Sequence, residues 1–411
     1  MSFLLFRNFF SLAGAEAFSK VITFLAFAYL ARLFGASGFG YIEWAAAALM
    51  CASLIVDQGF SAYGTREIAK SPERTGQLVA EIVTARFILA ITSYSALAAA
   101  VLLIDLEPVM RSLLLIYGAS LLILPLLLQW VFQGHDRMNV VALAQVIRQT
   151  VFVGVVFLFV KGTEDLYVVG VAEIAGVACA ALFTSVLYRI GFAKLAVWKP
   201  ALSYGLFREG FPIGLSQMFW TAKMFGATFL VGVVADSRET GLFAGAMRIY
   251  IALHTFVWLY YANLLPSLSR GWDLKDGSFR RLIFGSMKLV VPGSLGIAVV
   301  WVFLSSWAMG TAYGPGFVEG GQALAWLAGA FACAAISGHF RFGLIAAGFQ
   351  NQEMWTSAAG AIAALVLIPV GYSYAGIGGC AAGLFIGEVL VLLLSGVFGW
   401  QLLFGVRPSN R

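Results

Sequence analysis

Residues 140–160 of the 411-residue chain read VVALAQVIRQTVFVGVVFLFV, and this run has the length and composition of a membrane-spanning helix. Arg148 is its only charged residue. At about 1.5 Å per residue, a helix of about 20 apolar residues crosses the hydrocarbon core of a bilayer, which is about 30 Å thick. The polar breaks Gly134–Asn139 and Lys161–Asp165 bound the run. The stretch therefore predicts one membrane span with a turn at each end.

The composition of the whole chain agrees with this reading. Apolar residues make up 61% of the chain and charged residues only 11%, and the mean hydropathy is +0.90. A soluble domain has about 25% charged residues, so this chain cannot cover a water-facing surface of its size. That excludes a soluble enzyme, a nucleic-acid-binding module and a disordered scaffold. We attribute the formal charge of +6 to Lys and Arg residues in cytoplasmic loops, and not to a surface that binds nucleic acid.

Eleven polar breaks divide the chain into twelve apolar runs, which predicts an all-α integral membrane protein with about twelve transmembrane helices. The breaks are Gly35–Gly38, Arg66–Gln77, Asp105–Pro108, Gly134–Asn139, Lys161–Asp165, Phe192–Arg208, Asp236–Thr240, Ser267–Arg281, Gly310–Gly320, Gln350–Glu353 and Gly371–Tyr374.

Basic residues in short loops favour the cytoplasmic side of a membrane. With the N-terminus inside, that side holds Arg7, Arg66, Lys70, Arg74, Arg137, Arg189, Lys194, Lys199, Arg208, Arg270, Lys275, Arg280, Arg281, Arg407 and Arg411. The other side holds only Arg32, Arg111, Lys161 and Arg238. Both termini are therefore predicted to be cytoplasmic. No cleavable signal peptide is expected, because Arg7 is followed by a long apolar span and not by a small-residue cleavage site.

A sequence repeat at an offset of 201 residues suggests two similar halves. The motif Leu-Phe-Arg-x-x-Phe begins at Leu5 and again at Leu206, and Gly40 matches Gly241. Six helices in each half make the repeat parallel, which predicts a substrate site between the halves near the midplane. The predicted organisation is a six-helix bundle over 1–191, a cytoplasmic linker over 192–205, and a second six-helix bundle over 206–411.

Seven cations lie within the predicted spans. Lys288 and Arg341 are near cytoplasmic helix ends and are expected to extend to the interface. The deep ones are Lys20, Arg86, Arg148, Lys223 and Arg248. Each costs about 2.5–3.5 kcal/mol if it faces lipid, so they are predicted to face the interior.

Two interpretations of the deep cations stay open. Lys223 and Arg248 have no acid within one turn on their own helices, as expected of cations that bind an anionic substrate such as a phosphate. The alternative is salt bridging between helices with the interior acids. Those acids are Glu16, Glu173 and Glu388. Because a poorly solvated carboxyl group takes up a proton more readily, they are also candidates for proton coupling.

Other features are predicted to be structural. Gly379, Gly383 and Gly387 form a small-residue stripe of the kind that packs helices closely. His254 and His339 are isolated histidines, interpreted as polar core residues. No metal, nucleotide or nucleophile motif is present, so we expect no cofactor, no metal and no enzymatic activity.

One stretch resembles a known family. Ala31-Arg32-Leu33-Phe34-Gly35-x-x-Gly38-Phe39-Gly40, followed by Asp57-x-Gly59 and Arg66-Glu67-Ile68-Ala69, is similar to the opening of polysaccharide-type lipid-linked oligosaccharide flippases. These include the O-antigen (Wzx-type) flippases of the multidrug/oligosaccharidyl-lipid/polysaccharide (MOP) exporter superfamily. The resemblance implies two MATE/MOP-like six-helix bundles around a cationic cavity, with Lys20 and Lys223 as its cations.

The resemblance also implies a function. The protein would move undecaprenyl-diphosphate-linked oligosaccharide units across the bacterial inner membrane by alternating access, for O-antigen or exopolysaccharide synthesis. It would act as a monomer among membrane lipids, alongside a polysaccharide polymerase and glycosyltransferases. A MATE-like multidrug exporter is the alternative, and a membrane oligosaccharide polymerase or ligase is a more remote one.

Overall fold

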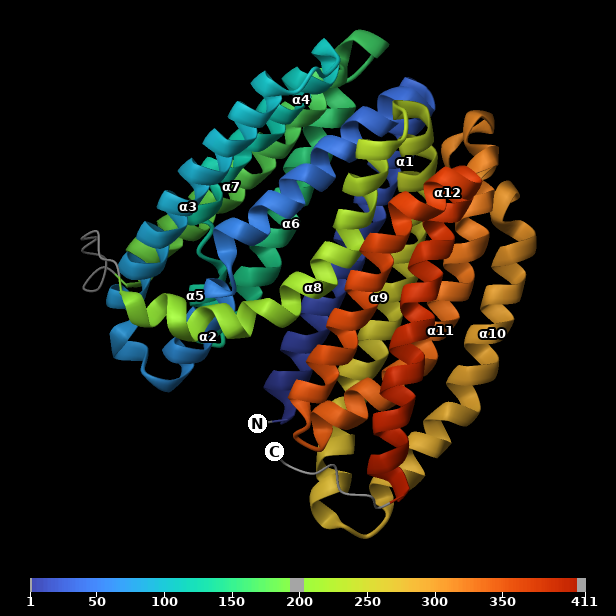
Figure 1. Ribbon diagram of the computed structural model, residues 1–411. Coiled ribbons are helices and arrows are strands. Elements are labelled where there is room, and N and C mark those ends of the chain that lie inside the picture. Colours follow the sequence, from blue (N-terminus) through green and yellow to red (C-terminus); the bar gives the residue numbers. More distant parts are fainter. Residues whose placement is uncertain (1, 193–202, 405–411) are drawn as a thin grey trace. The chain divides into compact units, whose positions relative to one another are not determined.

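The computed structural model describes residues 2–192 and 203–404, and their side chains apart from those of 2–18, 204 and 209–217. Within these ranges the chain forms helices and turns and no strand (Figure 1). The helices are α1 (Ser2–Asp57), α2 (Phe60–Lys70), α3 (Thr75–Leu103), α4 (Pro108–Ala119), α5 (Gln129–Gly134), α6 (Met138–Phe159), α7 (Leu166–Gly191), α8 (Tyr204–Val234), α9 (Ser237–Leu274), α10 (Ser278–Tyr313), α11 (Gly321–Ala346) and α12 (Gln350–Phe404). The predicted all-helical class is confirmed.

Two of these helices each contain two predicted spans joined by a kink. In α1 the kink is at Gly35, with φ 66° and ψ −175°. In α12 it is at Ala375 and Gly376, directly after the predicted break Gly371–Tyr374. Nine described segments, α1 and α12 among them, are long and apolar enough to cross a membrane, and α8 adds the shorter apolar segment Met218–Val234. With α1 and α12 counted as two spans each, the described residues account for the twelve predicted spans.

The kink at Gly35 gives a prediction for stability. Its φ and ψ lie in a region that essentially only glycine adopts, at a cost to other residues of about 1–3 kcal/mol. A Cβ added there meets no atom within 4 Å, so Gly35→Ala is expected to lower the free energy of unfolding by that backbone cost alone. The measurement is equilibrium unfolding in mixed micelles.

Gly154→Ala is the matched control for this substitution. A Cβ at Gly154 also meets nothing within 4 Å, but Gly154 lies inside the regular helix α6. Because alanine favours the helix by up to about 1 kcal/mol, the control is expected to be neutral or stabilising. Equal responses at Gly35 and Gly154 would contradict the strained-kink interpretation.

The span from Pro108 to Gly134 is interrupted at a proline. The short 3-10 helix Leu124–Leu126 contains Pro125, and the chain is extended at Leu127 before α5 begins. The backbone N–H of Leu128 donates to Oγ1 of Thr184 on α7 at 3.2 Å. A polar side chain from a neighbouring helix thus satisfies a backbone group released by the break, as a membrane interior requires.

The contacts divide the chain into two compact units, Met1–Thr221 and Ala222–Arg411, so the division falls inside α8. Most of the predicted linker 192–205 lies outside the described residues, and the predicted domain boundaries stay a prediction. In the first unit Thr23 of α1 donates to Gln149 of α6 at 2.8 Å. In the second unit α11 packs against α9, α10 and α12 (Figure 1).

The glycine stripe is confirmed as a close-packing surface inside the second unit. A Cβ at Gly379 would overlap the carbonyl oxygen of Gly371, and one at Gly383 would lie 2.9 Å from the carbonyl carbon of Leu367. At Gly387 it would lie 2.8 Å from the Cβ of Ala364. The two halves of α12 therefore touch almost backbone to backbone. This contact fixes the position of the next residue, Glu388.

Large apolar side chains are exposed along α10. Leu289 is 72% exposed, Phe303 81% and Trp307 65%. A surface of this kind is stable against lipid and unfavourable in water. Together with the apolar spans, it identifies a multi-pass membrane protein.

Candidate functional site

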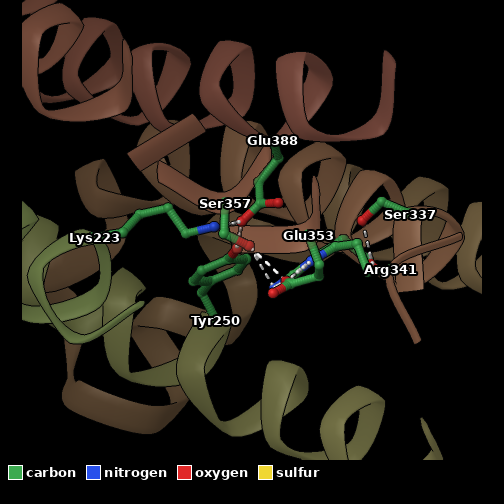
Figure 2. Close-up of polar contacts among 8 residues, drawn as sticks. Lys223, Tyr250, Ser337, Arg341, Glu353, Ser357 and Glu388 are labelled. Atoms are coloured by element: carbon green, nitrogen blue, oxygen red, sulfur yellow. Dashed lines mark hydrogen bonds and ion pairs between the residues drawn. The ribbon is translucent and has the colours of Figure 1, made fainter. Parts of the chain in front are cut away.

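The second unit contains a buried ion pair between α8 and α12. Nζ of Lys223 donates to Oε1 of Glu388 at 2.6 Å, and the two side chains are only 5% and 1% exposed. The hydroxyl of Tyr250, on α9, donates to the same oxygen at 3.2 Å. Figure 2 shows Lys223 and Tyr250 both pointing toward Glu388. Three helices therefore meet at one carboxylate.

A second ion pair in this unit joins α11 to the first half of α12. Arg341 donates to Oε1 of Glu353 through Nε at 2.9 Å and through Nη2 at 2.6 Å (Figure 2). Nη2 also donates to Oγ of Ser357 at 2.8 Å, and that hydroxyl donates to Oε1 of Glu353 at 2.7 Å. Glu353 lies in the first turn of α12, at a predicted polar break, so the expectation that Arg341 extends to the interface stays a prediction.

In the first unit two of the deep cations form ion pairs with residues of neighbouring helices. Nη2 of Arg148 on α6 donates to Oε1 of Glu173 on α7 at 2.6 Å. Nη2 of Arg86 on α3 lies 2.7 Å from Oδ1 of Asp57 at the end of α1. The Arg86 side chain is 8% exposed, and its Nε and Nη1 have no hydrogen-bond partner among the described residues. Ser61 donates to the same Asp57 oxygen at 2.7 Å.

Three of the five deep cations are paired with carboxylates. The predicted role of Arg86, Arg148 and Lys223 in binding an anionic substrate stays a prediction. Salt bridging between helices is observed for all three, so the expectation that such cations are unpaired is wrong. The physical reason is that a carboxylate on another helix offsets the cost of a buried cation better than distant water does.

The predicted site residues Lys20, Arg248 and Glu16 are not part of the ion pairs described above. Lys20 is exposed on α1, and Arg248 is half-buried on α9. Both residues have interactions with neighbouring groups. The side chain of Glu16 lies outside the described residues, so its predicted pairing with Lys20 stays a prediction.

Both predicted core histidines are buried in the second unit. His339 contacts the hydroxyl of Tyr261 through Nδ1 at 2.7 Å and the hydroxyl of Ser286 through Nε2 at 2.9 Å. The His254 ring lies 5.9 Å from the ring of Tyr250. Both are polar core residues, as predicted. Among the described residues no group of three His, Cys, Asp or Glu is placed to hold a metal ion.

Sequence reasoning missed Tyr250 and the Arg341–Glu353 pair. Tyr250 lies 138 residues from Glu388 along the chain, so no helical spacing connects them. Ser357 and Glu353 are four residues apart, which places them on one helix face. For the Arg341–Glu353 pair the available signal was that the two residues are 12 apart on consecutive helices, on either side of a short connection.

Comparisons with known proteins agree with this architecture. A family model described as "Polysaccharide biosynthesis protein" matches residues 5–272. A protein of Escherichia coli (strain K12) named for O-antigen transport is 22% identical over 274 residues, which cover 64% of this chain and 64% of that protein. A protein of Shigella dysenteriae with the same name is 24% identical over 276 residues, 64% of this chain and 68% of that protein. The chain thus aligns with less than two thirds of the Escherichia coli relative.

Solved structures share the fold over nearly the whole chain. An inward-facing MATE-family multidrug transporter of the MOP superfamily has a TM-score of 0.76 at 12% identity, with 96% of both chains covered. The lipid II flippase MurJ, in an inward closed conformation, has a TM-score of 0.71 at 12% identity, with 97% of this chain and 93% of that one covered. At such low identity the likeness is one of fold, and it confirms the predicted MOP architecture.

Proposed function

Because the chain belongs to the polysaccharide biosynthesis protein family, we propose that it is a flippase for undecaprenyl-diphosphate-linked oligosaccharide units. The observation that carries the proposal is the family match over residues 5–272. The fold shared with the MurJ flippase supports it. The protein would lie in the bacterial inner membrane with both termini in the cytoplasm, as the distribution of loop Lys and Arg residues favours.

The paired cations would supply the chemistry that such a substrate needs. Its polar headgroup is a sugar on a diphosphate, and its lipid tail stays in the bilayer while the headgroup crosses. A guanidinium binds phosphate through two parallel hydrogen bonds, and an ammonium acts as a point charge. Arg86, Arg148 and Lys223 place both kinds of donor inside membrane-spanning segments.

Stability alone gives no reason for ions at these positions. Replacing a buried ion pair by apolar side chains of similar volume is often neutral or stabilising by about 1–4 kcal/mol. Ionisable residues inside membrane spans more often mark a substrate or ion pathway. We infer that the carboxylates hold the cations between transport events and that the diphosphate competes for them during transport.

A cationic drug would need different chemistry. It would bind to a carboxylate, and Glu173 and Glu388 are each paired with a cation at 2.6 Å. The match to the polysaccharide biosynthesis protein family favours the flippase over the multidrug alternative, although MATE transporters share the fold.

Reconstitution in vesicles tests the proposal directly. The full chain is inserted into vesicles that contain undecaprenyl-diphosphate-linked oligosaccharides with a fluorescent sugar, and dithionite added outside bleaches the outer leaflet. We expect the protected inner-leaflet fluorescence to become accessible at least ten times faster than in protein-free vesicles, for at least one of several sugar structures.

Two controls make this measurement specific. Undecaprenyl linked to the same sugar through a single phosphate tests whether the diphosphate is needed, and its movement is expected to be slower. Ethidium transport tests the drug-exporter alternative. Ethidium efflux without movement of any lipid-linked sugar would contradict the flippase proposal.

A further inference from the structure

We propose that Glu388 is a proton-coupling site: a proton bound at its free oxygen Oε2 releases the Lys223 ammonium to the substrate diphosphate. This inference rests on the proposed function, because it takes a polyprenyl diphosphate as the ligand. It makes the ion pair of Figure 2 the element that links proton binding to substrate binding.

The two carboxylate oxygens of Glu388 have different surroundings. Oε1 accepts from both Lys223 and Tyr250. Oε2 is buried and has no hydrogen-bond partner among the described residues. An unsatisfied buried acceptor is unfavourable, and Oε1 already has two donors. The free oxygen is therefore where a further proton binds.

Charge balance explains why a proton is needed. The ammonium of Lys223 and the carboxylate of Glu388 together carry no net charge, so the closed pair does not attract an anion. One proton on Oε2 converts the carboxylate into a neutral acid, while the ammonium keeps its charge of +1. The diphosphate then takes the place of the carboxylate. Loss of the same proton restores the pair and releases the diphosphate.

Other titratable and charged groups also face this carboxylate. They are Lys223 on α8, Tyr250 and His254 on α9, and Cys333 and Arg341 on α11. The positive charge of Arg341 is already balanced by the carboxylate of Glu353. His254 is the group that could take the proton instead of Glu388, and the test therefore includes it.

The Arg341–Glu353 pair provides a matched control. It has the same 2.6 Å separation, but its side chains are 19% and 13% exposed, against 5% and 1% for Lys223 and Glu388. Glu353 also accepts from Ser357, a donor on its own helix. Glu353→Gln thus removes a paired glutamate of the same unit without touching the proposed proton site.

The experiment measures protons taken up when a diphosphate binds. The purified full chain in detergent, weakly buffered and with a pH indicator, is mixed with farnesyl diphosphate. Wild type is expected to take up one proton per bound diphosphate, and the affinity is expected to rise up to tenfold for each unit that the pH falls, since the coupling is reciprocal. Glu388→Gln is expected to abolish both effects, and Glu353→Gln to keep both.

The comparison between variants removes the protons exchanged by the diphosphate itself, because every variant binds the same ligand. If Glu388→Gln does not fold, infrared difference spectra of wild type replace it: a protonated carboxyl band is expected to appear when the diphosphate binds and to persist in Glu353→Gln, and its absence in wild type overturns the inference. Uptake that persists in Glu388→Gln, or that is lost only in His254→Gln, overturns the inference.

The two proposals fail in different ways. Wild type that translocates lipid-linked sugars in vesicles and binds farnesyl diphosphate without taking up a proton overturns the proton site and leaves the flippase intact. Wild type that neither binds the diphosphate nor moves any lipid-linked sugar overturns both.

Discussion

Lys223→Ala is expected to lower the free energy of unfolding by about 3–5 kcal/mol, the usual effect of removing one partner of a buried ion pair. The reason is that Glu388, 1% exposed, would lose its counter-charge and keep only Tyr250 as a donor. It would then carry an uncompensated charge or take up a proton, and either costs free energy in the folded state. The measurement is equilibrium unfolding of the purified protein in mixed micelles, with wild type in parallel.

Two control variants separate loss of the charge balance from loss of packing. Lys223→Met combined with Glu388→Leu removes both charges at similar volume and is expected to unfold at or above the wild-type free energy. Lys70→Ala removes a lysine that is 60% exposed and 3.0 Å from Glu67, and its expected cost is below about 1 kcal/mol. If Lys223→Ala were as mild as Lys70→Ala, the buried pair would not have the energetic role assigned to it.

Gly379→Ala is expected to destabilise the protein by about 3 kcal/mol or more, at or above the upper end of the usual cost of overpacking. The added Cβ would overlap the carbonyl oxygen of Gly371, and a backbone atom cannot rotate away as a side chain can. The two halves of α12 would have to separate. Unfolding of the purified variant in mixed micelles measures the loss.

Gly293→Ala is the control for this substitution, because a Cβ at Gly293 on α10 meets no atom within 4 Å. It is expected to unfold within about 1 kcal/mol of wild type. Gly379→Ala should also weaken the contact of Glu388 with Lys223, since both Gly379 and Glu388 lie on the second half of α12. A Gly379→Ala protein as stable as Gly293→Ala would show that the two halves are not closely packed.

The membrane spans could be predicted from sequence because hydropathy is a local property. Each span needs only about 20 apolar residues and a polar end, and even the kinks fall at or next to predicted glycine-containing breaks, at Gly35 and Gly376. The glycine stripe was predictable for the same reason, since four-residue spacing on one helix is visible in the sequence.

The pairing of the cations could not be predicted in the same way. Glu388 is 165 residues from Lys223, and hydropathy carries no information about which distant helices become neighbours. The pair of Arg148 and Glu173 was easier to predict than that of Lys223 and Glu388. They are 25 residues apart on consecutive spans joined by a short turn, so their similar depth could have suggested the pair.

The long separation between Lys223 and Glu388 has a consequence for biogenesis. A ribosome adds about 5–20 residues per second, so the 165 residues between the two take about 8–33 s to synthesise. During that interval α8 has already left the translation tunnel, and its lysine has no counter-charge from the last helix. The nascent chain must tolerate a lone ammonium, worth about 2.5–3.5 kcal/mol against insertion, until its final segment arrives.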